Sequence, residues 1–249
     1  MTTPAPLPKK QRRDIDAMVL RFIERRDTYA HLAKTVHMLL SEHGQLRPHI
    51  HSVKYRVKDP ENLRSKLRRK AQEARALGRQ FDITPDNFFQ RVGDLAGVRV
   101  LHLNTTQMEE IDRAIRTILK DESYRIVEGP IANTWDDEYR NYFRGINIRT
   151  TPRPSMYTSV HYVVESGARS SPRCELQVRT LVEEVWGEVS HTVNYPEETK
   201  SVACQEQLRV LARVSSSCTR LVDSVFASHK EHVDASRQKA RKLKPKRPR

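Results

Sequence analysis

The segment 173–180 carries three side chains whose chemistry suits a charged substrate. Glu175, Gln177 and Arg179 occupy alternate positions, so an extended strand would place a carboxylate, an amide and a guanidinium on one face. The other face of the strand is apolar and predicts a buried side. A half-buried edge strand with a solvated polar face has the same pattern, but neighbouring segments favour a polar cleft instead.

Two further segments bring matching groups. A second strand, predicted from the alternation of residues 98–103, carries Arg99 on its polar face and Asp94 at its entrance. An extended run further along places Tyr157 and His161 on one side. Carboxylates that hold Mg²⁺, next to cations that hold phosphates, are typical of a nucleotide-phosphate site.

A group of cations lies where a predicted strand runs into a helix. Asp59 is a good helix cap, and Pro60 suits the first helical position. Because a helix N-terminus favours anions, Arg56, Lys58 and Lys66 could converge there on a phosphate. Alone, they would be ordinary surface cations.

The elements that would position these groups alternate between helix and strand. The predicted fold class is therefore α/β (α+β), with long helices at both ends. The predicted helices cover about residues 12–41, 60–78, 87–92, 106–119, 181–193 and 201–233, and the predicted strands cover residues 50–57, 98–103, 125–127, 157–161 and 173–180. Residues 131–154 show no regular pattern, and so long a connection favours a substrate lid.

Length and composition bound the class of protein. With 249 residues the chain suits one domain of generous size. No run of about 18 apolar residues exists, and no apolar segment follows the basic N-terminus, so we expect no membrane span and a cytoplasmic location. We expect a disordered N-terminus over 1–11, one domain over 12–235 and a disordered basic tail over 236–249.

The charge of the chain is unevenly distributed. The formal net charge is +14, and residues 237–249 hold eight basic residues and no acid, which leaves +6 for the rest. Such a tail binds polyanions without selecting among them. Attraction to RNA and a plain solubilising role are both open.

In their order, these segments resemble the synthetase domain of the RelA/SpoT family, and in particular its short, single-domain alarmone synthetases. The residues that carry the resemblance are 56–67, 94–100, 157–161, 175–180 and 186–195, within a core of about 50–196. The resemblance implies a nucleotidyltransferase-like fold, in which helices flank a mixed β-sheet. It also implies Mg²⁺-dependent transfer of the β,γ-diphosphate of ATP to the 3′-hydroxyl of GDP or GTP, which makes ppGpp or pppGpp.

The resemblance also implies a role for each site residue. Asp94 and Glu175 would be catalytic and hold the Mg²⁺, and Glu175 would help to deprotonate the 3′-hydroxyl. The expected ATP-binding residues are Arg56, Lys58, Lys66 and Arg99, the two arginines stacking on adenine. The expected acceptor-binding residues are Tyr157, His161, Gln177, Arg179 and Arg153, with Tyr157 stacking on guanine.

The chain departs from the family pattern just before Tyr157. Family members usually have a glycine where this chain has Met156, and a lysine and an asparagine where it has Arg153 and Ser155. A glycine lets the backbone approach a ligand closely, so this departure bears on how the acceptor is held.

Three functions remain open on the sequence. The first is alarmone synthesis from ATP and GDP or GTP. The second is pyrophosphate transfer to the 3′ end of tRNA, as in toxin-type relatives, which the basic tail suits. The third is a non-catalytic module that binds RNA or a nucleotide, which the two carboxylates argue against. We expect no hydrolase activity, because the chain has no His-Asp dipeptide, and we leave a homo-oligomer open.

Overall fold

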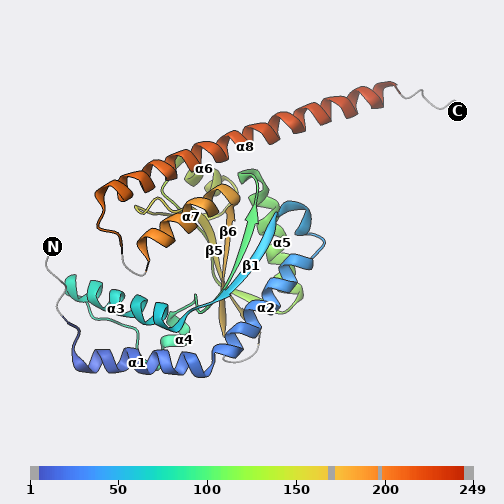
Figure 1. Cartoon of the computed structure of the whole chain (residues 1–249). Helices are drawn as coiled ribbons and strands as arrows, with labels where there is room; N and C mark the ends of the chain where they lie inside the picture. Colours follow the sequence, from blue (N-terminus) through green and yellow to red (C-terminus); the bar gives the residue numbers. More distant parts are fainter. Residues whose placement is uncertain (1–5, 168–171, 196–197, 244–249) are drawn as a thin grey trace.

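A computed structural model of the chain describes residues 6–167, 172–195 and 198–243 (Figure 1). Its helices are α1 (Lys9–Glu24), α2 (Arg26–Glu42), α3 (Pro60–Ala76), α4 (Phe88–Arg91), α5 (Met108–Asp121), α6 (Asp137–Gly145), α7 (Leu181–Asn194) and α8 (Val202–Leu243), with short 3₁₀ turns η1 (Arg47–His49) and η2 (Thr105–Gln107). Its strands are β1 (Ser52–Val57), β2 (Ala96–His102), β3 (Tyr124–Thr134), β4 (Arg149–Pro152), β5 (Ser159–Ser166) and β6 (Arg173–Thr180).

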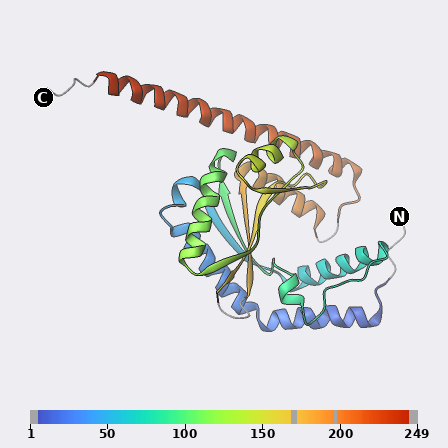
Figure 2. The same cartoon turned by 180° about the vertical axis from the view of Figure 1, so that it is seen from behind.

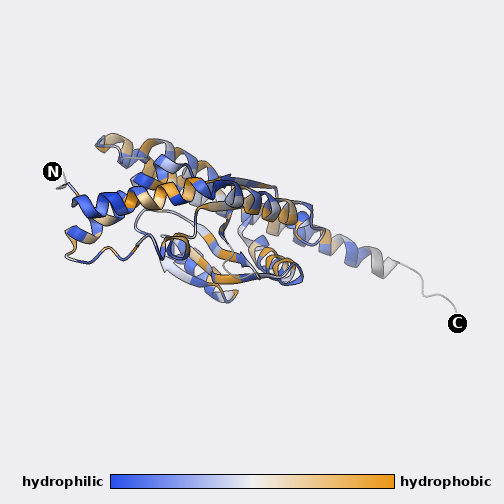
Figure 3. Cartoon of the chain, turned by 90° about the horizontal axis from the view of Figure 1, so that it is seen from below, coloured by the Kyte–Doolittle hydropathy of each residue, from blue (hydrophilic) through white to orange (hydrophobic). Residues whose placement is uncertain are grey.

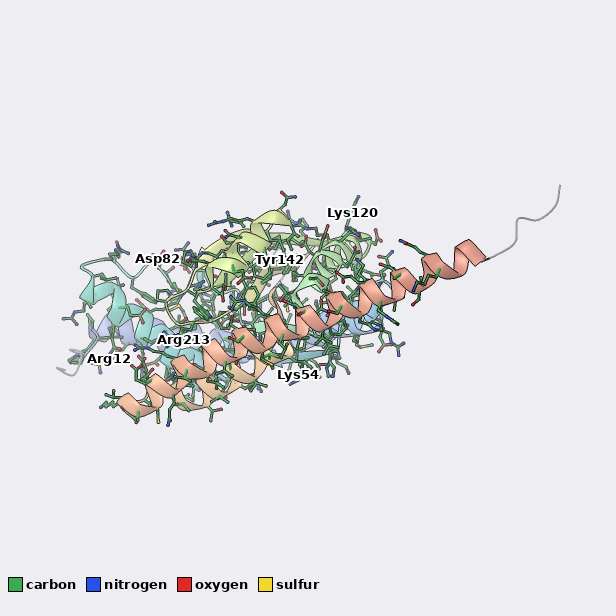
Figure 4. All side chains as sticks on the ribbon, turned by 90° about the horizontal axis from the view of Figure 1, so that it is seen from above. Arg12, Lys54, Asp82, Lys120, Tyr142 and Arg213 are labelled. Carbon is green, nitrogen blue, oxygen red and sulfur yellow. The ribbon has the colours of Figure 1, made fainter. Side chains whose placement is uncertain are left out.

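The strands form one mixed sheet in the order β1-β2-β6-β5-β3-β4. The pairs β2–β6 and β3–β4 are parallel, and the other neighbours are antiparallel. The predicted α/β class and mixed sheet are confirmed. Helices lie on both sides of the sheet, and α8 crosses the molecule and extends past it (Figures 2 and 4).

One face of the sheet builds the core. The strand register aligns a row of aliphatic residues across five strands: Val53, Val100, Val178, Val160 and Ala132. Helix α2 packs against β1 and β2, and α5 packs against β3. These helices are amphipathic, with apolar and polar residues alternating around them (Figure 3). The opposite face of the sheet is left to polar side chains and to α7.

The single long helix predicted over 12–41 is instead two helices. Arg25 interrupts it with a non-helical backbone, φ −109° and ψ 7°. The break separates two packing partners, because α1 lies against α3 while α2 lies against the sheet. Amphipathic spacing alone does not reveal such a change of direction.

The segment 131–154 was predicted to be irregular, and this prediction is wrong. Strand β3 continues to Thr134, and α6 and β4 follow it. Asp136 caps α6, its carboxylate accepting from the backbone N–H groups of Glu138 at 3.0 Å and Tyr139 at 3.3 Å. The segment is therefore built into the fold and is not a long loop over the site.

The two ends of the domain also differ from the predicted boundaries. Helix α1 begins at Lys9, inside the stretch predicted to be disordered, and α8 continues to Leu243, past the predicted boundary at 236. Residues 244–249 of the basic tail lie outside the described residues. No helix in the described part of the chain is long and apolar enough to cross a membrane.

Candidate active site

The strand register brings the predicted site residues together on the polar face of the sheet. Lys54, Arg99, Gln177 and His161 form one row across β1, β2, β6 and β5. In the adjacent row Arg56 lies opposite Gly97, and Gly97 lies opposite Glu175. Because residues in register share a face, the sheet gathers side chains that are far apart in sequence.

Asp94 lies just before β2, and its side chain pairs with one lysine after β1 and another on helix α3. Its Oδ2 atom lies 3.3 Å from Nζ of Lys58 and 2.7 Å from Nζ of Lys66. The predicted cap is present, because Asp59 accepts from two backbone N–H groups of the first turn of α3, each at 3.0 Å. Burial opposes the ionisation of Asp94, but the charges of Lys66 and Lys58 outweigh it and hold its pKa well below the usual range. The predicted convergence of cations is therefore confirmed for the two lysines.

Glu175 is held at both oxygens. Gln177 donates to Oε2 at 2.7 Å, and Nδ1 of His161 lies 3.2 Å from Oε1. An ionised carboxylate only accepts, so Nδ1–H of His161 is the donor, and Nε2 is free to accept from the Tyr157 hydroxyl, 3.0 Å away. Burial would raise the pKa of Glu175, but the hydrogen bonds from His161 and Gln177 lower it below its ordinary value.

Two arginines share a pair of carboxylates from α7. Arg99 lies 3.2 Å from Glu184 and also contacts Glu188. Arg179 contacts Glu184 as well, and its Nη2 lies 3.9 Å from Glu188. Arg179 also lies 5.8 Å from the centre of the Tyr157 ring. Planar guanidinium groups fixed in this way can stack on a base or grip a phosphate.

These residues line two cavities that share part of their walls. The first, of about 500 Å³, contains Glu175 and His161 among its walls, and we call it the glutamate chamber. The second, of about 370 Å³, contains Arg56 and Arg99, and we call it the arginine chamber. Asp94 and Lys66 line both chambers, so they stand at the junction.

The structure divides the predicted residues unevenly between the chambers. All four expected ATP-binding residues line the arginine chamber. The expected acceptor-binding residues do not line one pocket: Arg153 and His161 face the glutamate chamber, whereas Tyr157, Gln177 and Arg179 face the arginine chamber. The Tyr157–His161 hydrogen bond links the two groups.

Sequence reasoning missed three polar residues of the glutamate chamber: Lys70, Arg91 and Asn133. Lys70 follows Lys66 by one helical turn, which was an available signal. Burial lowers the pKa of Lys70, and the charge of Lys66 lowers it further. Asn133 accepts from Nε of Arg153 at 2.8 Å and belongs to the segment that was taken as irregular.

The position next to Tyr157 is strained. Met156 has φ +59°, a left-handed conformation that glycine adopts readily and other residues adopt at a cost. The backbone thus keeps the conformation that a glycine would allow, although the side chain is a methionine. Strain of this kind is typical of ligand-binding segments.

Comparisons with known proteins identify relatives of this chain. The family model described as "Region found in RelA / SpoT proteins" matches residues 55–200. The chain is 26% identical over 151 residues to GTP pyrophosphokinase YwaC of Bacillus subtilis, covering 59% of this chain and 59% of that relative's length. The chain therefore spans less than two thirds of that relative.

Solved structures show the same fold. Small alarmone synthetase 1 from Bacillus subtilis matches with a TM-score of 0.57 at 16% identity, over 85% of this chain and 98% of that chain. Its structure bound to its product pppGpp matches with a TM-score of 0.54 at 17% identity, over 84% and 96%. Its structure bound to AMPCPP matches with a TM-score of 0.53 at 16% identity, over 82% and 96%.

The family match covers more than half of the chain, including every strand of the sheet but part of β1. It contains every residue that was predicted to bind a nucleotide or a metal ion. On this evidence the chain belongs to the RelA/SpoT family.

Proposed function

We propose that this protein transfers the β,γ-diphosphate of ATP to the 3′-hydroxyl of GDP or GTP, and so makes ppGpp or pppGpp. The observation that carries the proposal is the junction of two chambers at Asp94 and Lys66. A group-transfer enzyme needs a donor and an acceptor side by side, with charged groups where they meet. The relatives bound to pppGpp and AMPCPP support this assignment of ligands.

ATP occupies the arginine chamber in this proposal. Arg56 and Arg99 stack on the adenine ring, with Glu184 and Glu188 holding Arg99 in place. Lys58 and Lys66 receive the phosphates, because both ammonium groups already face the chamber at Asp94. The phosphate oxygens and the Asp94 carboxylate then together neutralise the two lysine charges.

GDP or GTP occupies the glutamate chamber, with its 3′-hydroxyl toward Glu175. The 3′-oxygen attacks the β-phosphorus of ATP, and the bond from that phosphorus to the oxygen bridging to the α-phosphate breaks, releasing AMP. The hydroxyl proton passes to Glu175, whose lowered pKa keeps it ionised and able to accept at neutral pH. Lys70, Arg91 and Arg153 are the cations available to the acceptor's 5′-phosphates.

Mg²⁺ is part of this proposal, and the residues at the site suit it. Among the described residues, no three or more His, Cys, Asp or Glu side chains gather as a metal site. Mg²⁺, however, is usually held by one or two carboxylates together with substrate phosphates. Oδ1 of Asp94 is buried without a hydrogen-bond partner in the described structure, and Glu175 lines the same chamber. When bound by these two residues, Mg²⁺ would neutralise charge on the phosphate oxygens.

A label-transfer assay tests the proposed function. The full chain is incubated with γ-labelled ATP and one acceptor at a time: GDP, GTP or deacylated tRNA. We expect the label on GDP or GTP, and its loss in Glu175→Gln but not in Glu206→Gln, which removes an exposed carboxylate from α8. Label on tRNA alone would establish the tRNA-directed reaction instead. No label on any acceptor would overturn the proposal and favour a non-catalytic binding module. The proposal also includes a cytoplasmic location, where ATP and GTP are available, and no hydrolase activity.

A further inference from the structure

A small buried cavity lies behind Arg179. It is lined by residues of β2, β5, β6, η2, α5, α6, α7 and α8, which include Arg179, Glu183, Thr105 and Tyr139. Its volume of about 20 Å³ suffices for one water molecule. Arg179 also lines the arginine chamber, so one residue borders both the cavity and the proposed nucleotide site.

The cavity contains polar atoms that lack partners. Glu183 is 4% exposed and Thr105 is 6% exposed. Oε1 of Glu183 and Nε of Arg179 are buried without a hydrogen-bond partner in the described part of the chain, whereas the Thr105 side chain interacts with Asp223 and Tyr139. Leaving buried polar groups unpaired costs free energy. We therefore expect this pair of a carboxylate and a guanidinium to have a function.

Several charged or titratable groups surround Glu183. They are Arg179 on β6, His102 on β2, Asp136 and Tyr139 at α6, and Arg220 and Asp223 on α8. Burial raises the pKa of Glu183 to about 7, with Arg179 opposing and Asp136 reinforcing the shift. Burial lowers the pKa of His102 to about 4, so that ring is neutral near pH 7. Arg220 already pairs with Asp136. Arg179 is therefore the cation that Glu183 can influence.

We propose that Glu183 is a positioning residue for Arg179, and that its protonation sets how strongly the arginine chamber holds nucleotide phosphates. This inference rests on the proposed function of that chamber. When ionised, the carboxylate accepts from Nε of Arg179, directly or through one water, and draws the guanidinium charge toward the cavity. When protonated, it no longer attracts that charge.

The sign of the effect follows from the charges. Arg179 already faces Glu184 and Glu188, so ionisation of Glu183 adds a third carboxylate and weakens the attraction for phosphate. Nucleotide affinity therefore falls as the pH rises through 7. By linkage, a bound nucleotide competes for Arg179 and raises the pKa of Glu183, so binding at pH 7 takes up protons at Glu183.

Calorimetric titration of the full chain measures both effects. AMPCPP and, separately, GDP are titrated between pH 6 and pH 8, and at pH 7 in two buffers with different heats of ionisation. For a rise of half to one pKa unit in Glu183 from its free value of about 7, the wild-type Kd should rise about 2.5- to fivefold over this range. Nucleotide phosphates titrate in every variant, so the difference from Glu183→Gln isolates Glu183. That variant should lose the excess proton uptake and, at pH 8, bind the nucleotide more tightly than the wild type does at the same pH. Glu206→Gln, the exposed control, should behave as the wild type.

The same experiment can overturn the inference. Equal pH dependence and equal proton uptake in the wild type and in Glu183→Gln would remove Glu183 from nucleotide binding. Glu183→Met tests the same point with an uncharged, apolar side chain if the glutamine variant does not fold. Failure of both variants to fold, judged by circular dichroism, would make Glu183 a structural residue. A wild-type chain that binds neither nucleotide would overturn the proposed function itself, which is a different outcome.

Discussion

Replacing Gly187 by alanine should separate activity from stability. A Cβ atom at this position of α7 would lie 3.1 Å from Cζ and 3.3 Å from Nη2 of Arg179, and closer still to Nη1. Ordinary carbon contacts are about 3.5–4.0 Å, so the guanidinium, and Nη1 above all, must move by roughly 1 Å or more. Such a shift disturbs its contact with Glu184 and its place in the arginine chamber. Because a misplacement of about 1 Å can cost about 100-fold in rate, we expect kcat/KM to fall between 10- and 100-fold.

The Gly187→Ala variant should lose activity without losing stability. Gly187 lies inside a helix, where alanine is more favourable than glycine by about 1 kcal/mol, which offsets the local crowding. We expect an unchanged or slightly higher melting temperature, measured beside the kinetics. Gly145→Ala is the matched control, since a Cβ there meets nothing within 4 Å in the described structure. A Gly187→Ala enzyme with kcat/KM within twofold of the wild type would refute the role given to Arg179.

Four further predictions concern the site and its surroundings. Glu175→Gln should abolish transfer while ATP still binds, because the cations remain; near-normal turnover would remove Glu175 from the mechanism. Tyr157→Ala should raise the KM of the nucleotide acceptor far more than that of ATP, since stacking on a base contributes about 1–3 kcal/mol. Tyr157 lines the arginine chamber but its hydroxyl lies 3.0 Å from His161 of the glutamate chamber; a larger rise for ATP would assign the ring to the ATP side instead. Met156→Gly should raise the free energy of unfolding by about 1 kcal/mol in urea titrations, because glycine accepts φ +59° without strain; a loss of stability would mean that the methionine side chain matters more. Deleting residues 237–249 should leave kcat/KM for GDP within about twofold at moderate salt, where charges are screened beyond about 8–10 Å. A collapse of that activity with an intact circular dichroism spectrum would make the end of α8 part of the active unit.

Which side chains come together at the site could be predicted in part, because several of the elements that carry them have local sequence signals. Alternation along β6 assigned Cys174, Leu176 and Val178 to the core, and all three are buried. The cap at Asp59 located the start of α3 and hence the convergence of Lys58 and Lys66. Each of these features is set by neighbouring residues, so the sequence contains it.

Other features depend on tertiary partners and could not be predicted in the same way. The break at Arg25 follows from which element each half of the N-terminal segment meets. Glu183 looked like an ordinary helix residue, and only the packing of α6 and α8 buries it. The division into two chambers likewise depends on where Arg153 and Tyr157 come to lie. The cap at Asp136 was a local signal for α6 that the polar composition of the segment obscured.

The products formed from ATP and GDP test the central claim most directly. Phosphorus-31 NMR of the reaction mixture distinguishes a diphosphate on the ribose 3′-oxygen from one on the 5′-oxygen, and it distinguishes AMP from ADP. The account predicts equal amounts of AMP and of a guanosine nucleotide that carries a new 3′-diphosphate, with neither formed by Glu175→Gln. Formation of ADP, or consumption of ATP without a 3′-phosphorylated guanosine nucleotide, would contradict it.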